Sequence, residues 1–128
     1  MIVINNQEEM NPYYNEETNT YIFSKNNRLI DIKIDFDLNI ECNINARNIN
    51  AWDIKARDIQ ALNINAWNIN AWNINSGDIN ADNIDANNIS FYSVCFARET
   101  FVCNSIKGRR ENSKYFCLDS EVVIKSQN

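Results

Sequence analysis

The sequence predicts an all-β protein, a small parallel β-solenoid in which a short strand and a bend recur every five residues. Three observations predict it. Isoleucine stands at every fifth residue from Ile44 to Ile89, alanine or serine follows two residues later in each repeat until Phe91 follows Ile89, and asparagine or aspartate comes immediately before each isoleucine. Self-similarity at a short fixed period is the sequence signature of a repeat architecture. We therefore expect each pentapeptide to be one structural unit.

The five-residue period excludes straight elements. In an α-helix, five residues advance about 140° beyond one full turn, so the isoleucines would spiral around the axis. In a straight strand, an odd period would place successive isoleucines on opposite faces. A chain that bends once per repeat keeps isoleucine and alanine inside. We expect the first-place asparagine or aspartate at the bend, where these residues tolerate unusual backbone angles, and the third place in solvent.

The flanks divide the chain into four parts of one domain. Residues 1–29 are polar and irregular, contain the only proline, and are expected to form a partly ordered N-terminal arm. Residues 30–44 alternate apolar and polar side chains, which predicts one half-buried capping strand, or two strands with a bend. Residues 43–106 form the predicted solenoid. Residues 107–128 provide a basic turn and a C-terminal β cap, built from a hairpin or from two final strands.

Larger side chains close the predicted solenoid at its C-terminal end. After Ile89 the five-residue phase continues with aromatic residues at the inward place. The expected inward residues are Phe91, Phe96, Phe101 and Ile106.

The "NINAW"-type repeats over residues 43–106 resemble those of the pentapeptide-repeat proteins. The resemblance implies a right-handed β-helix with about four repeats per coil. In that family a small residue comes first and a large one follows two residues later, whereas here the large isoleucine comes first, so two- and three-sided coils stay open as alternatives. The chain from about residue 43 onward also looks like small uncharacterised proteins of bacteriophages and mobile elements, which implies a host bacterial cell.

The net charge and the histidine and cysteine content of the chain argue against several classes of function. The net charge of −5 argues against a general binder of nucleic acid or anionic membranes, because both partners require positive charge. Histidine is absent, and the four cysteines form no CxxC pair, so we expect no catalytic residue, no metal and no cofactor, and cysteines that act as small buried hydrophobes. No signal peptide and no long apolar run is present, which favours the cytoplasm.

The fifth place of the repeat carries the candidate partner-binding residues. With four sides, Trp52, Trp72 and Tyr92 would share one column and Arg47 could lie over Trp67 as a cation–π pair; with three sides, Trp52 and Trp67 would stack. Exposed aromatic residues are favoured as contact anchors. The alternatives are that the N-terminal arm covers them, or that an aromatic ladder simply stabilises the sheet.

Two charged features compete with the aromatic residues. Carboxylates at two- and four-residue spacing on the first strand form a possible acidic face, similar to the duplex-like charge that several pentapeptide-repeat proteins present to topoisomerases. These carboxylates are Asp31, Asp35, Asp37 and Glu41. A basic turn would suit RNA, DNA or an acidic partner. Its residues are Lys107, Arg109, Arg110 and Lys114. In both cases the alternative is an ordinary solvated surface.

We derive three functional hypotheses. The first is a non-catalytic, phage-encoded inhibitor that binds a host protein acting on nucleic acid, such as restriction, CRISPR or topoisomerase machinery. The second is a nucleic-acid-binding protein that uses the basic turn and the aromatic residues, with salt-dependent binding. The third is a self-assembling module whose end strands pair between copies. A homodimer through the C-terminal cap is compatible with all three.

Overall fold

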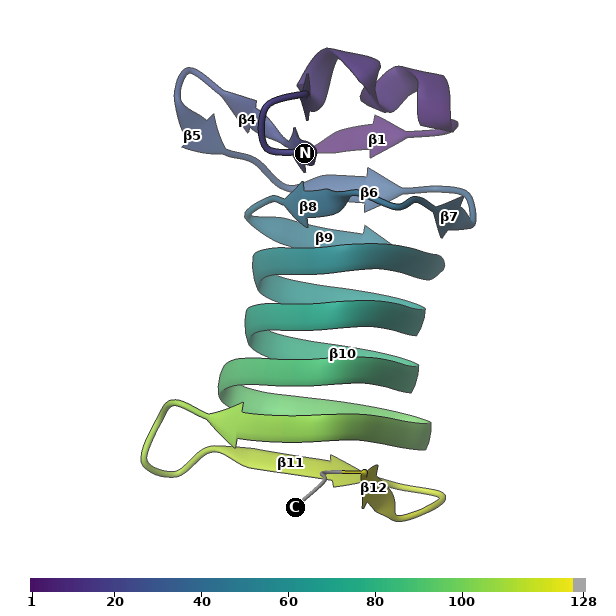
Figure 1. Cartoon of the computed structure of the whole chain (residues 1–128), viewed down its shortest axis with the longest axis vertical. Helices are drawn as coiled ribbons and strands as arrows, with labels where there is room; N and C mark the ends of the chain where they lie inside the picture. Colours follow the sequence, from purple (N-terminus) through teal and green to yellow (C-terminus); the bar gives the residue numbers. More distant parts are fainter. Residues whose placement is uncertain (126–128) are drawn as a thin grey trace.

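The computed structural model describes residues 1–125 and confirms an all-β protein made mostly of strands, with one short helix (Figure 1). The N-terminal elements are β1 (Ile2–Ile4), the 3-10 helix η1 (Gln7–Tyr13), β2 (Tyr14–Asn15), β3 (Thr20–Ile22), β4 (Ser24–Lys25) and β5 (Arg28–Leu29). The remaining strands are β6 (Ile32–Ile34), β7 (Leu38–Asn39), β8 (Asn43–Asn45), β9 (Asn48–Ala51), β10 (Asp53–Gly108), β11 (Lys114–Cys117) and β12 (Val122–Ile124).

The main sheet contains ten strands and is curled, and all its strand pairs except β2 with β3 are parallel. In Figure 1 the long β10 winds in successive turns beneath β9. Neighbours across the sheet are 15 residues apart where β10 meets β8 and β9, as for Ile59 beside Ile44 and Ile64 beside Ile49. Three pentapeptides therefore separate a residue from its neighbour on the previous turn.

The core is built from the second and fourth places of the repeat, as the sequence predicts. Every isoleucine of the series from Ile44 to Ile89 is buried, and so is each alanine two residues later. Burial of one isoleucine contributes about 1.5–3 kcal/mol, so the stacked series supplies the main stabilising term. Ser76 occupies an alanine place and is also buried; its hydroxyl donates to the carbonyl oxygens of Leu62 and Asp78 at 3.3 and 3.0 Å.

The reason for asparagine at the bends differs from the expected one. Among residues 1–125, the non-glycine residues with positive φ are Asn19, Asn26 and Asn27, all in the N-terminal segment. The repeats therefore bend without left-handed backbone. Their first-place asparagines instead form hydrogen bonds to side chains on the neighbouring turn, which are described below.

The N-terminal segment is an ordered end cover. Strand β1 pairs with β6 and β3 pairs with β8, so this segment adds strands to the edge of the winding. Within this segment, the side chains of Met10, Tyr21 and Phe23 are buried in the core. The Asn6 side chain caps η1 by accepting from the Glu9 backbone N–H. In Figure 1 this segment lies at one end of the molecule, and β11 and β12 lie at the other.

Residues 30–44 form three short strands, β6, β7 and β8, where the sequence predicts one or two. These strands pair with β9 and with two separate stretches of β10, so they already follow the winding. Their alternation of apolar and polar residues continues through the bends, and the sequence pattern therefore does not reveal where they occur.

The C-terminal closure follows the prediction in part. Phe91 and Phe101 are buried, whereas Phe96 is only partly buried and Cys95 and Ala97 point inward instead. One extra residue causes this shift: the Val94 N–H donates to Asp78 at a spacing of 16 residues. Strands β11 and β12 each pair in parallel with β10, which makes them two final strands. Residues 126–128 of the predicted cap lie outside the described residues.

Candidate functional site

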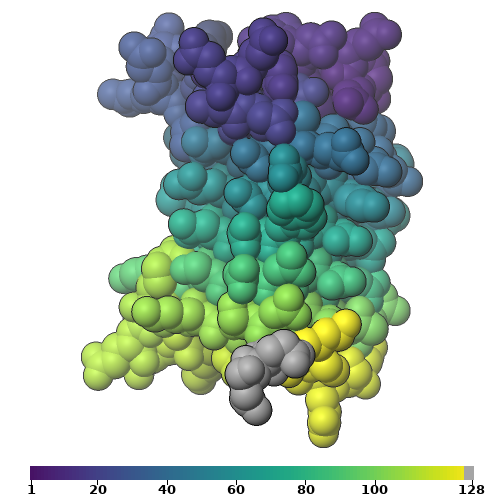
Figure 2. Space-filling model, viewed as in Figure 1, coloured from purple at the N-terminus to yellow at the C-terminus, as the bar shows by residue number. Residues whose placement is uncertain are grey.

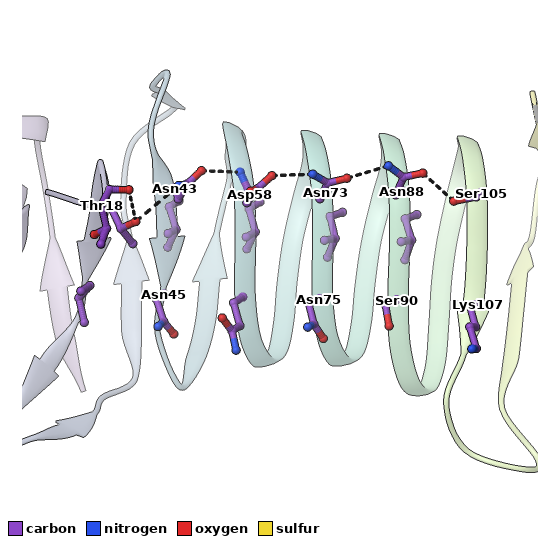
Figure 3. Close-up of a pocket in the computed structure, with 17 residues that line it drawn as sticks. Thr18, Asn43, Asn45, Asp58, Asn73, Asn75, Asn88, Ser90, Ser105 and Lys107 are labelled. Carbon is purple, nitrogen blue, oxygen red and sulfur yellow. Dashed lines mark hydrogen bonds between the residues drawn. The ribbon is translucent and has the colours of Figure 1, made fainter. Parts of the chain in front are cut away.

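The outer surface of the winding is held by ladders of first-place side chains. In the ladder of Figure 3, Asn73 donates to the Asp58 carboxylate at 2.8 Å, Asn88 donates to Asn73 at 2.8 Å, and Ser105 donates to Asn88 at 2.6 Å. Each amide thus links its own turn to the previous one.

Two further ladders repeat this arrangement at the other bends. One joins Asp31, Asn48 and Asn63, and the other joins Asp53, Asn68 and Asn83. Because most of these bonds span 15 residues, they fix neighbouring turns in register and hold the surface side chains on a firm support.

The third-place side chains form a second row. Figure 3 shows its members Asn45, Asn75, Ser90 and Lys107 beside the ladder. A shallow recess of about 660 Å³ runs between the two rows.

The fifth-place residues lie in three columns of 15-residue spacing, which we name by their first member. The Arg47 column contains Arg47, Leu62, Gly77 and Tyr92; the Trp52 column contains Trp52, Trp67 and Asp82; and the Arg57 column contains Arg57, Trp72 and Asn87. The five residues predicted as one partner-binding set are therefore divided among three bends.

The three tryptophans remain exposed, with exposed fractions of 41% for Trp52, 57% for Trp67 and 52% for Trp72. Trp52 and Trp67 stack nearly parallel, with ring centroids 5.7 Å apart and 10° between the planes. Trp72 lies under the guanidinium of Arg57, 4.2 Å from the ring centroid. The stacking matches the three-sided alternative. On the face of the molecule that Figure 2 shows, the N-terminal residues gather at one end and leave the middle of the chain uncovered.

Arg47 makes a different contact from the predicted cation–π pair with Trp67. Its Nε and Nη2 donate to the Asp31 carboxylate at 2.8 and 3.0 Å, and Asn48 donates to the same carboxylate at 2.9 Å. The Arg47 hydrogen bond and charge lower the pKa of Asp31. The cation–π role at the Trp columns is taken by Arg57 instead.

The predicted acidic face does not form a single row. Asp35 follows β6, Asp37 precedes β7 and Glu41 lies between β7 and β8, and these strands pair at different places along the winding. Asp31 is already neutralised by Arg47. The continuous strand assumed from the alternating pattern would have placed all four carboxylates together; the bends separate them.

Two arginines of the basic turn, Arg109 and Arg110, form hydrogen bonds within the chain. Arg109 donates to the Asn75 side chain at 3.0 Å, to Ser90 at 2.7 Å and to the Ser76 carbonyl oxygen at 2.9 Å. Arg110 donates to Ser93 at 3.2 Å. Arg109 therefore fastens the turn to the preceding turns of β10. Lys107 lines the recess of Figure 3, and Lys114 begins β11.

A second recess, which the sequence reasoning missed, lies on the Arg47 column. It has a volume of about 700 Å³ and is centred on Gly77, with Leu62 on one side and Tyr92 on the other. Its only charged lining residues are Arg28, Arg47 and Arg109. The available signal was the departure of "NINSG" from "NINAW", which removes the fifth-place side chain at one turn.

The cysteines behave as small apolar residues where they are inside. All four are free; Cys95 and Cys103 are buried, and burial raises the pKa of both thiols. Within residues 1–125, no three His, Cys, Asp or Glu side chains gather in a metal-holding group. No helix in this part of the chain is long and apolar enough to cross a membrane.

No protein-family model, curated protein or solved structure matches this chain.

Proposed function

We propose that this chain is a non-catalytic interaction protein whose strands form a closed parallel β-solenoid of three pentapeptides per coil. The 15-residue spacing of the ladders and of the pairs between β10 and strands β8 and β9 supports the three-sided coil. The right-handed sense rests on the resemblance to pentapeptide-repeat proteins. In such a scaffold each bend presents one outward side chain per coil at about 4.8 Å spacing.

The proposed binding surface consists of Trp52, Trp67, Arg57 and Trp72. The observation that carries it is the exposure of three large aromatic rings on a hydrogen-bonded support. Tryptophan and arginine are enriched among residues that dominate binding energy at protein interfaces. The three rings are already ordered by the stack and by Arg57, so these side chains lose little conformational entropy when a partner binds.

The proposed partner is a host protein that acts on nucleic acid, and the chain would inhibit it in the bacterial cytoplasm. Support comes from the resemblance to proteins of phages and mobile elements. Between the two candidate surfaces, the aromatic one is favoured over charge mimicry of a duplex. A duplex carries one charge per about 1.7 Å, whereas the four carboxylates here are dispersed and Asp31 is paired.

Capture from a bacterial lysate tests this surface. We expect the wild-type chain to retain a specific partner that the double variant Trp52→Ala with Trp67→Ala loses, since each ring supplies contact area. Leu118→Ala removes an exposed apolar side chain at the far end and serves as the matched control. The purified partner should then lose nucleic-acid activity when the chain is added. A partner retained equally by the double variant would exclude this surface.

The C-terminal end favours self-association as a second candidate function. Strands β11 and β12 each pair with β10 and with no other described strand. Exposed apolar side chains lie on or beside them, namely Tyr115, Phe116, Leu118, Val123 and Ile124. Open strand edges with such residues are templates for pairing with another chain. Light scattering should show a concentration-dependent mass that Leu118→Lys reduces; a monomer at all concentrations would reject this function.

A further inference from the structure

The recess at Gly77 has the dimensions of a slot for one planar group. Leu62 and Tyr92 are 30 residues apart in the same column, which corresponds to two turns, or about 9.6 Å, at the usual strand spacing. Gly77 lies between them and contributes no side chain. Leu62 and Tyr92 are 59% and 53% exposed, so the apolar surfaces that flank the gap are open to solvent.

The neighbouring column demonstrates that flat groups stack at this spacing. Trp52 and Trp67 occupy consecutive turns and lie nearly parallel at 5.7 Å. A Cβ at Gly77 would clash with the Leu62 backbone carbonyl oxygen, so the two backbones approach closely there. A planar ring in the recess would lie outside these backbones, between the Leu62 and Tyr92 side chains. It would stack on Tyr92 and cover Leu62, as a tryptophan covers its neighbour one bend away.

The electrostatics of the slot favour an anion. Three arginines line it and no carboxylate does, in a chain whose net charge is −5. Arg47 is neutralised by Asp31, and Arg109 uses three of its five N–H donors within the chain. Within the part of the chain that the structure describes, the Arg28 guanidinium has no hydrogen-bond or ion-pair partner. A phosphate near Arg28 would therefore gain charge-assisted hydrogen bonds.

Amide groups beside the slot supply the remaining recognition. Asn45 and Gln60 line it, and neither side chain has a hydrogen-bond partner among residues 1–125. The Asn45 Oδ1 is buried without a donor, which is costly unless the amide rotates toward a ligand group. Amides provide both donors and acceptors, which is the combination that the edge of a nucleobase requires.

We propose that the Gly77 recess binds a nucleoside monophosphate. The base occupies the slot between Leu62 and Tyr92, and the phosphate is held at Arg28. This site is separate from the tryptophan surface, so a test of nucleotide binding is independent of the partner-binding function proposed above.

Isothermal titration with AMP, GMP, CMP and UMP tests the site. At low salt we expect at least one of them to bind, and its affinity to fall as salt rises. The matching nucleoside and inorganic phosphate should each bind at least tenfold more weakly, because each supplies half of the contacts. Tyr92→Ala should weaken binding at least fivefold, because it removes the aromatic face on which the base stacks.

Two variants that each remove one positive charge distinguish binding of phosphate at Arg28 from a general electrostatic attraction to the protein surface. Arg28→Gln should weaken binding about tenfold, while Lys55→Gln, which removes the same charge at an exposed residue outside the recess, should leave it within twofold. Equal loss in both, or no binding by any of the four nucleotides, would overturn the proposal. So would binding of a single-stranded oligonucleotide without binding of its mononucleotides, because that result assigns the recess to a polymer.

Discussion

First-place asparagine residues act in one direction along the winding. Asn73 donates its amide N–H to the preceding turn and accepts from the following one. An aspartate carboxylate has no N–H to donate to the preceding turn, but it can still accept from the following one, as Asp58 does from Asn73. At Asp58 the bond to the preceding turn is made by its own backbone N–H, which donates to Asn43 at 3.1 Å. The exchange of asparagine and aspartate in the sequence therefore has a hydrogen-bonding reason.

Removal of one ladder amide should lower the free energy of unfolding. Asn73→Ala deletes a donor and an acceptor, so we expect a loss of about 1–3 kcal/mol, at about 0.5–1.5 kcal/mol per hydrogen bond. Asn65→Ala is the matched control, since that exposed third-place amide has no hydrogen-bond partner within residues 1–125. Urea unfolding followed by circular dichroism measures both, and equal effects would contradict a specific role for the ladder.

The ion pair of the Asp31 carboxylate should make the free energy of unfolding depend on pH in the acidic range. Its pKa is lower in the folded chain than the usual value of about 3.9, so its contribution is present above that value and is lost as pH falls through the folded pKa. The stability difference between wild type and Asp31→Asn should thus shrink in acid. Urea titrations of the wild type and of Asp31→Asn at a series of pH values measure this difference, and a difference that stays constant as pH falls would contradict the stabilising ion pair with Arg47.

At the scale of elements, the sequence predicts the repeats well and the flanks poorly. Ile44 to Ile89 recur at a period that no straight element accepts, so the bends and the buried places follow directly. From Ile30 to Ile44 the period is two, which fits a straight strand equally well, and the bends between β6, β7 and β8 leave no mark. The Gly77 recess depends on which residues become neighbours, and that required the 15-residue spacing.

The interior of β10 should be less tolerant than its end. Ile69→Ala leaves a cavity between turns, and we expect a cost of about 2–5 kcal/mol. Ile106 is only partly buried near the end of the strand, so Ile106→Ala should cost clearly less. Denaturant unfolding of the two variants provides the comparison. A similar loss of unfolding free energy in both would show that the C-terminal end of β10 is packed as firmly as its middle.

For the whole molecule, the two ends are unequal. The N-terminal end is covered by strands β1 and β3 and by the segment that buries Met10. The C-terminal end finishes in strands with exposed apolar side chains. A parallel winding has an open edge at each end, and only the first of these is well protected.

Deletion of residues 1–29 should expose strand edges at the N-terminal end and cause copies of the chain to associate there. Strands β6 and β8 would lose their partners β1 and β3, so we expect the truncated chain to associate. Size-exclusion chromatography with light scattering measures the mass. The truncated chain should associate even with Leu118→Lys at the opposite end; a stable monomer would contradict the protective role.

The 15-residue spacing also restricts how such a gene can lengthen. Duplication of 15 codons within the repeats adds a full turn and leaves every later side chain above its former neighbours. Duplication of five codons rotates everything downstream by one bend, which would bring Tyr92 out of line with Leu62 and separate Trp72 from Arg57. Both insertions preserve the buried isoleucines, so both chains would fold. Descendants of this gene can thus vary freely in length while their surfaces are inherited only in steps of three repeats.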